Sequence, residues 1–458
     1  MPLRLIHVTY RFRHRTVAVL LCPLVLGGRS AAQSPNVPPR VLTLRALLDS
    51  VRNHPTSLAV ESRVRAAQGS RVAAGTFGNP VLSYQVDQTP FPGGRSLVGL
   101  EREAMTTATF PLEFLYQRGP RVSRANAELR AAQSDATLAR QRLGLDAASA
   151  YYRVALGQVQ VATTRDLLGW LDTLVVYNRS RVREGVAAEA DLLRSQLERD
   201  RVGAEAAMQE AELARSRAAL ASYISASPTP GELTVAIDDA PFPLATLTPD
   251  VTVRSASGEA VSGAIVSVDA RPDIRAARER VAASKAAVTS ERSMLVRQLG
   301  ATIGTMQSGH LTSMIAGVSL PIPVFDQNRG EIQRAGAERD AATYELASQE
   351  RMANAELRGA IDAARILTER TSALVRQDSS NFLARADESR RIALGAYREG
   401  AVPLFQVIDA ARAWVDARMT YYQTIAAQHQ SVLSLIVAQG LDLSTALPNL
   451  TSHGENLR

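Results

Sequence analysis

Two long stretches of this sequence contain no proline. Residues 121–183 and 330–399 are rich in alanine, arginine and glutamate, and at about 1.5 Å per residue they predict helices roughly 95 and 105 Å long. No single globular domain is that wide. In the second stretch mainly apolar residues recur every three or four positions: Leu357, Ile361, Ala364, Leu367, Thr371 and Leu374. This spacing is typical of helices that pack side by side.

The sequence is also internally duplicated. Phe110-Pro111-Leu112 is repeated as Leu320-Pro321-Ile322, 210 residues later, and similar residues follow both motifs at matching positions. In each copy we expect the same order of elements: a helix, two strands, a very long helix, a glycine turn and a return helix. One unit of about 200 residues, present twice, therefore accounts for most of the chain.

The duplication and the leader divide the chain into five predicted segments. They are a signal peptide at 1–32; a first repeat at 33–226 with a strand pair at 79–111 and a tip at 183–186; a Pro-rich joint at 227–270; a second repeat at 271–442 with a strand pair at 299–321 and a tip at 398–401; and a tail at 443–458.

The first 32 residues have the three parts of a secretory signal. A basic stretch reaches Arg15, an apolar run covers residues 16–26, and Ser30-Ala31-Ala32 is a small-residue cleavage site. The mature protein is expected to begin at Gln33. Cys22 is the only cysteine of the chain, so the mature protein has no thiol chemistry, and a lipid anchor at Cys22 is not expected because Leu21 and Pro23 flank it.

The basic charge of the chain lies mostly in this leader. Five arginines and no acid within residues 1–32 supply five of the seven net positive charges, which leaves +2 for the rest. No basic block follows, because arginine alternates with aspartate and glutamate along the predicted helices. We therefore expect no nucleic-acid partner.

The segment between the helices of each copy changes to a period of two. Leu82, Tyr84 and Val86 alternate with polar residues, and residues 301–306 and 313–320 show a similar alternation. An ordinary soluble hairpin would also alternate. If these strands lie in lipid, their edges must pair, and four strands are too few to close a barrel. Two chains would give a filled barrel, whereas three would give twelve strands and a lumen.

Together these features resemble the TolC-like outer-membrane efflux protein family over nearly the whole mature chain. Residues 319–330, which read SLPIPVFDQNRG, are particularly similar to the branch that serves heavy-metal resistance pumps of the resistance-nodulation-division type. The resemblance implies a mainly α fold with a small β part. In it, the duplicated long helices form a periplasmic α-barrel, and four strands per chain contribute to an oligomeric transmembrane β-barrel. It also implies a homotrimer in outer-membrane lipid that docks to a periplasmic adaptor protein and an inner-membrane pump.

Glycines mark the two predicted tips, where a helix must reverse into the return helices 188–226 and 403–438. The tips are Arg183-Glu184-Gly185 and Arg398-Glu399-Gly400. The resemblance implies that they dock to the adaptor. It further implies a gate that includes Asp191, Tyr397 and Asp409, with Tyr397 hydrogen-bonded to Asp191. Val402 and Gln406 depart from the family's pattern, and a solvated helix-end carboxylate remains an alternative interpretation of Asp191 and Asp409.

No motif points to an enzyme, a cofactor or a bound metal. Residues 33–458 contain four histidines, which share no ligand spacing: His54, His310, His429 and His453. The expected function is the exit duct of an efflux pump for small solutes or metal ions. The alternatives are the outer-membrane duct of a protein-secretion system and, from another class, a structural periplasmic coiled-coil or adhesin protein.

Overall fold

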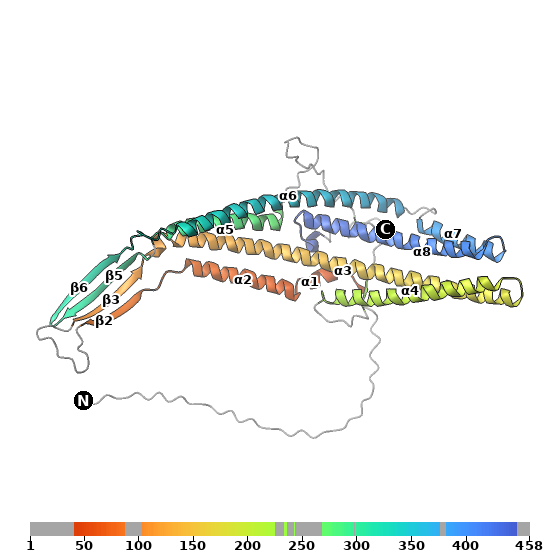
Figure 1. Cartoon of the computed structure of the whole chain (residues 1–458), viewed down its shortest axis with the longest axis horizontal. Helices are drawn as coiled ribbons and strands as arrows, with labels where there is room; N and C mark the ends of the chain where they lie inside the picture. Colours follow the sequence, from red (N-terminus) through yellow and green to blue (C-terminus); the bar gives the residue numbers. More distant parts are fainter. Residues whose placement is uncertain are drawn as a thin grey trace, which may run out of the picture. The chain divides into compact units, whose positions relative to one another are not determined.

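The computed structural model describes residues 41–87, 103–224, 233–235, 242, 268–296, 298–375 and 382–446. Over these residues the chain consists mainly of long helices, which continue into a four-stranded sheet (Figure 1). The predicted fold class is thereby confirmed for one chain, whose sheet is open. No helix within these ranges is both long and apolar enough to cross a membrane. The predicted signal peptide, most of the Pro-rich joint and most of the tail lie outside the described residues.

The first repeat contains the longest helix of the described chain. Its elements are β1 (Val41–Leu42), α1 (Leu44–Val51), α2 (Pro55–Gly75), β2 (Val81–Asp87), β3 (Glu103–Pro111), the 3-10 helix η1 (Glu113–Leu115), α3 (Arg118–Arg183) and α4 (Glu189–Ala221). The 66 residues of α3 confirm the prediction of one very long helix. Thr43 caps α1, because its hydroxyl accepts a hydrogen bond from the Ala46 amide at 3.3 Å.

The second repeat follows the same order. A short strand, β4 (Thr234–Val235), lies before the second repeat and pairs with β1 of the first. The repeat itself comprises η3 (Val268–Ala270), α5 (Pro272–Ser293), β5 (Gly300–Ser308), β6 (Leu311–Ser319), α6 (Arg329–Leu374), α7 (Phe382–Arg398) and α8 (Leu404–Ala438).

The prediction of one continuous helix over 330–399 was wrong. α6 ends at Leu374 with Val375 as its C-cap, and α7 begins at Phe382. The sequence between them contains Asp378, Ser379 and Ser380. Such side chains compete with helical hydrogen bonds and favour helix ends. The absence of proline therefore did not guarantee continuity.

The four strands form one antiparallel sheet in the order β2-β3-β5-β6. The turn between β5 and β6 contains Gly309, whose φ of +56° lies in the left-handed region. Strand pairs from the two repeats meet at the centre of the sheet, where β3 pairs with β5. The two outer strands, β2 and β6, have no partner among the described residues.

The two faces of this sheet differ in chemistry. The register places mostly apolar side chains on one face: Leu82, Tyr84, Val86, Ala104, Ala108, Phe110, Ala301, Ile303, Met314, Ala316 and Val318. Several of them are highly exposed, Leu82 to 76% and Met314 to 75%. The other face carries mainly polar or small residues and includes a hydroxyl pair, Thr109 and Thr302, at 3.0 Å. The predicted alternation is thus present across all four strands.

The helices next to the sheet have the same neighbour order as the strands. α2 packs on α3, α3 on α5, and α5 on α6. Toward the tips, α4 and α8 both pack on α3, and α7 packs on α8. Most exposed large apolar side chains of the long helices lie on the edge helices α2, α4, α6 and α7: Leu58, Val72, Leu193, Leu197, Met208, Tyr344, Met352, Ile366 and Ile392. Val176 and Phe405 are the exceptions.

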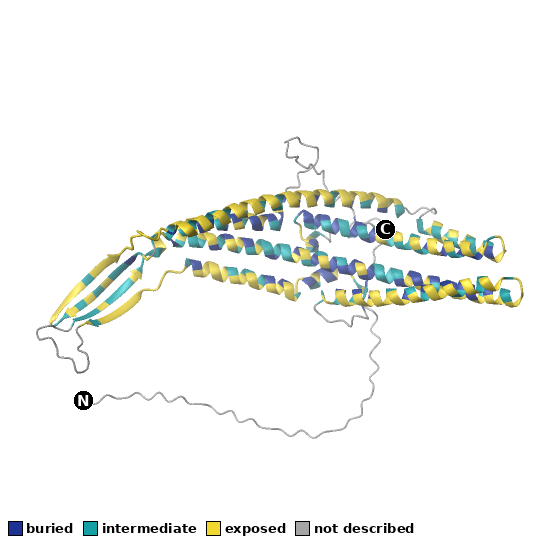
Figure 2. Ribbon diagram, viewed as in Figure 1, coloured by how far each residue is buried: buried dark blue, intermediate teal, exposed yellow. Residues whose placement is uncertain are grey.

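The most buried part of the chain lies where α1, α3, α5, α6 and α8 come together, away from both sheet and tips (Figure 2). Its largest fully buried side chains include Leu47, Ile274 and Ile436. The buried Arg271 guanidinium joins three helices there, because it donates to Asp273 at 2.8 Å, Glu356 at 2.7 Å and the Ala438 carbonyl at 3.1 Å. This region holds the two repeats together.

The sheet has no space for a side chain at Gly304. A Cβ there would lie 2.2 Å from the Thr106 carbonyl oxygen, a backbone atom of the neighbouring strand. We expect Gly304→Ala to lower the melting temperature of the detergent-solubilised protein, because β3 and β5 must separate. Gly317→Ala on the same face is the control, since nothing lies within 4 Å of a Cβ there. Equal melting temperatures for the two variants would contradict this register.

Candidate functional site

Each hairpin of helices ends in a turn that requires glycine. Gly185 has φ +71° and Gly400 has φ +77°. At the first tip the Gly185 amide donates to the Val182 carbonyl, and the Val186 amide donates to that of Arg181, each at 3.0 Å. The same pair of bonds closes the second tip. This is the Schellman arrangement, in which a left-handed residue satisfies the last carbonyls of a helix.

The charged residues of both tips are exposed. Arg183 and Glu184 directly precede Gly185 in the first tip, and Arg398 and Glu399 directly precede Gly400 in the second. Glu184 accepts a hydrogen bond from the Ser180 hydroxyl at 3.0 Å, which orients its carboxylate within α3. The duplicated sequence therefore presents two similar polar surfaces, each with one acid and one base at its tip.

Tyr397 lies beneath the second tip, between the two hairpins. It is 4% exposed, and its hydroxyl donates to the Asn178 side-chain oxygen on α3 at 2.7 Å. The Arg181 guanidinium lies 5.6 Å from the ring centroids of both Tyr397 and Tyr177. Burial raises the pKa of Tyr397, so the phenol remains a neutral donor.

Asp191 is half-buried in the first turn of α4, where a carboxylate is favourable to the helix dipole. Its charge acts on Tyr397, whose pKa it helps to raise. The phenol hydrogen bond within this chain nevertheless goes to Asn178 instead of Asp191. The sequence missed this partner because Asn178 lies 219 positions away and belongs to no motif.

Asp409 is exposed in α8, two turns beyond Gly400. No hydrogen bond among the described residues links Asp409 to Asp191 or Tyr397. Val402 is half-buried against the apolar cluster of Leu167, Leu171, Val407 and Ala411 beneath the tips. This position, which departs from the pattern that the resemblance implies, is thus part of the packing that joins the hairpins.

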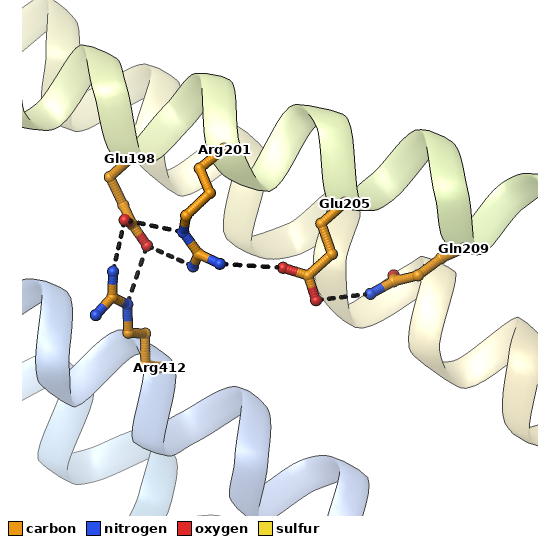
Figure 3. Close-up of polar contacts among 5 residues, drawn as sticks. All are labelled: Glu198, Arg201, Glu205, Gln209 and Arg412. Atoms are coloured by element: carbon orange, nitrogen blue, oxygen red, sulfur yellow. Dashed lines mark hydrogen bonds and ion pairs between the residues drawn. The ribbon is translucent and has the colours of Figure 1, made fainter.

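Sequence reasoning missed an ion cluster that surrounds one buried carboxylate on α4 and α8 (Figure 3). The Glu198 carboxylate accepts hydrogen bonds from Arg201 at 2.7 and 3.2 Å and from Arg412 at 3.0 and 2.6 Å. The bonds from Arg201, and then those from Arg412, lower the pKa of Glu198 to about 2 against the opposing effect of burial. Its stabilising contribution is therefore complete at neutral pH and is lost progressively as the pH falls from the ordinary pKa of 4.5 to about 2.

The described residues contain no group of three or more His, Cys, Asp or Glu side chains that could hold a metal ion. Two of the histidines take part in packing. His54 caps α2 by accepting from the Thr56 amide at 3.2 Å, and the His429 ring stacks on Phe242 with centroids 4.1 Å apart.

Comparison with known proteins gives matches at three levels. Residues 267–441 match the outer membrane efflux protein family. The nickel and cobalt resistance protein CnrC of Cupriavidus metallidurans is 27% identical over 350 residues, covering 75% of this chain and 76% of that protein. The nickel-cobalt-cadmium resistance protein NccC of Alcaligenes xylosoxydans is 24% identical over 356 residues, covering 75% and 74%.

Solved structures share the fold at lower identity. The outer-membrane channel OprN has a TM-score of 0.69 at 21% identity, covering 88% of this chain and 90% of its own. The outer membrane protein VceC of Vibrio cholerae has a TM-score of 0.68 at 19% identity, covering 87% and 96%. These likenesses cover most of each chain, so the fold is shared with solved structures.

The left-handed tip can be tested by a pair of alanine substitutions. We expect Gly400→Ala to destabilise the second hairpin by about 1 kcal/mol, because the new Cβ meets the following carbonyl at positive φ. Gly395→Ala, five residues earlier inside α7 and facing open space, should stabilise the helix by a similar amount. Urea titration measures both. Two shifts of the same sign would contradict the assigned turn.

Proposed function

We propose, on the premise that this chain is a TolC-like outer-membrane efflux protein, that it forms the outer-membrane exit duct of a tripartite efflux pump. The observation that carries the proposal is the two-faced sheet, with an exposed apolar side and a polar side. An ordinary soluble hairpin would cover its apolar face with a core, whereas this face remains exposed. An apolar face in lipid and a polar face on a lumen account for both sides.

The junction between sheet and helices supports a position in the outer membrane. Apolar side chains remain exposed along it: Phe77, Phe114, Leu115, Leu320, Ile322, Val324 and Phe325. Phe77 and Phe114 pack edge to face at 5.4 Å, and Arg118 lies 5.1 Å from the Phe77 ring. Apolar and aromatic groups beside arginine suit the boundary between lipid tails and headgroups. The long helices then extend into the periplasm.

A homotrimer follows from the open edges. In lipid, the unpaired backbone groups of β2 and β6 must find partners, and copies of the same chain supply them. Three copies give twelve strands and leave room for a lumen. The same closure joins α2 of one copy to α6 of the next, and α4 to α7. These are the helices on which exposed apolar side chains concentrate.

The solute class that fits this lumen is a divalent metal cation. The polar face carries Asp87 and Glu103 directly opposite each other, and the four described strands contain no lysine or arginine. A lumen with acids and no bases attracts cations and repels anions. CnrC and NccC are named for resistance to nickel and cobalt.

The polar tips would meet the adaptor, with Asp191, Tyr397 and Asp409 beside the aperture.

The function can be tested in cells and in bilayers. Deletion of the gene should raise cellular nickel and cobalt at a given external concentration, and the full-length gene should restore the wild-type level when adaptor and pump are present. The purified protein should have the mass of a trimer in detergent and open channels in planar bilayers. Channels that pass no cations, or a monomer without channel activity, would refute the proposal. Normal metal levels beside a normal channel would favour a protein-secretion duct.

Asp409 provides a test of the aperture. If three copies place this exposed carboxylate around a narrow opening, their charges attract cations and hold divalent ions. Asp409→Asn should then weaken the block of single-channel current by divalent cations and raise the relative conductance of anions. Glu212→Gln is the control, because Glu212 is exposed on α4 and pairs with Arg215 one turn away. If Asp409→Asn and Glu212→Gln give the same currents, Asp409 is only a solvated residue.

A further inference from the structure

The carboxylate of Glu198 is the least exposed acid among the ion pairs of the described chain, at 10% of its side-chain surface. Most other acids in these pairs are about half exposed, and surface pairs of that kind contribute little to stability. A carboxylate withdrawn from water loses much of its hydration, and close partners must offset the free energy of that loss. Glu198 has two such partners.

Arg412 approaches Glu198 in the bidentate geometry. Its Nε donates to Oε1 at 3.0 Å, and its Nη2 donates to Oε2 at 2.6 Å. Arg201 donates to the same two oxygens from the side of α4, and its remaining nitrogen lies 3.5 Å from Glu205. The two bases and two acids balance in charge. Parallel hydrogen bonds from a planar guanidinium fix orientation as well as distance.

The pair joins helices from different hairpins. α4 returns from the first tip and α8 returns from the second, and each packs on α3. Glu198 lies 13 residues beyond Gly185, and Arg412 lies 12 residues beyond Gly400. At about 1.5 Å per residue, both are therefore roughly 18 to 20 Å from their own tips along the helix. An ion pair at equal distances from the two tips fixes the axial register of the two helices as well as their separation.

Other links between the hairpins involve α3. Arg418 on α8 pairs with Asp166 at 3.1 Å, where the acid is 58% exposed, and Tyr397 contacts Asn178. Only the Glu198–Arg412 pair directly connects the two return helices among the described ion pairs. Its loss would leave no described ion pair between α4 and α8, and only apolar packing around Val202, Val407 and Ala411 would remain beneath the tips. Apolar packing fixes orientation less strictly, so the first tip would move relative to the second.

We infer that the Glu198–Arg412 pair is a positioning clamp that sets the spacing of the two tips in each chain, and thereby the width of the periplasmic aperture. The inference rests on the proposed function, because it assigns the aperture to these tips. Arg201 has a different part. It keeps Glu198 ionised and oriented from within α4, while Arg412 carries the connection to α8.

The test is a double-substitution cycle read in planar bilayers with the full-length trimer. Glu198→Gln and Arg412→Gln should each raise the open fraction by about two- to fivefold, the range expected for an ion pair with one half-exposed partner. The double variant should add little to either single change, because both remove the same contact. Arg412→Lys keeps the charge without the fork and should give an intermediate open fraction.

The control removes an arginine–glutamate pair inside one hairpin. Arg165 on α3 donates to Glu210 on α4 at 3.0 and 2.7 Å, and both are exposed. Arg165→Gln should leave the open fraction unchanged. The melting temperature of each trimer separates a change of aperture from general loosening.

Three outcomes are distinguishable. Open fractions equal to wild type in both Glu198→Gln and Arg412→Gln would overturn the clamp and leave the duct intact. Additive effects of the two substitutions, or a rise in Arg165→Gln as large as in Arg412→Gln, would also overturn it. If the wild-type protein forms no channel, the proposed function fails first.

Discussion

The backbone hydrogen bonds that β2 and β6 cannot make within one chain determine the rest of this structure. A strand edge in water can bond to solvent, but in hydrocarbon each unpaired amide or carbonyl costs several kcal/mol. The register leaves the two outer strands without partners in the described chain, while it exposes apolar side chains on one face. A single copy therefore cannot be the stable unit in a membrane. The helices also favour association with another copy, because most of their exposed large apolar side chains lie on the edge helices that would meet it.

Much of this fold could be predicted from the sequence because its signals are local. The lack of proline over 121–183 indicated α3, alternation indicated β2, and glycine after Arg-Glu indicated both tips. The end of α6 at Leu374 could not be predicted from the absence of proline, because proline is only one of several residue types that favour helix ends. Absence of one breaker is weaker evidence than presence of a helix signal.

The candidate site was less accessible to sequence reasoning because its contacts are distant in the chain. Glu198 and Arg201 resemble any i,i+3 surface pair, and nothing near them announces Arg412, 214 positions away. Tyr397 was singled out as a gate residue bonded to Asp191, and in this chain its hydroxyl bonds to Asn178, on the outgoing helix of the first hairpin. Duplication predicted where the tips are. It could not predict which side chains connect them, because the connecting residues differ between the repeats.

The matched neighbour order of strands and helices creates a mismatch in circumference. Strands lie about 4.8 Å apart, so twelve of them at a tilt of about 40° close around roughly 75 Å. Twelve upright helices at 8 to 10 Å need roughly 95 to 120 Å. The segments between them, such as 76–80 and 320–328, must flare outward to bridge the two rings. Prolines at 80, 321 and 323 suit this task, since they hold extended backbone that neither ring has to hydrogen-bond. The exposed apolar side chains between sheet and helices, such as Phe77, Phe114 and Phe325, thus lie where the channel wall changes its circumference.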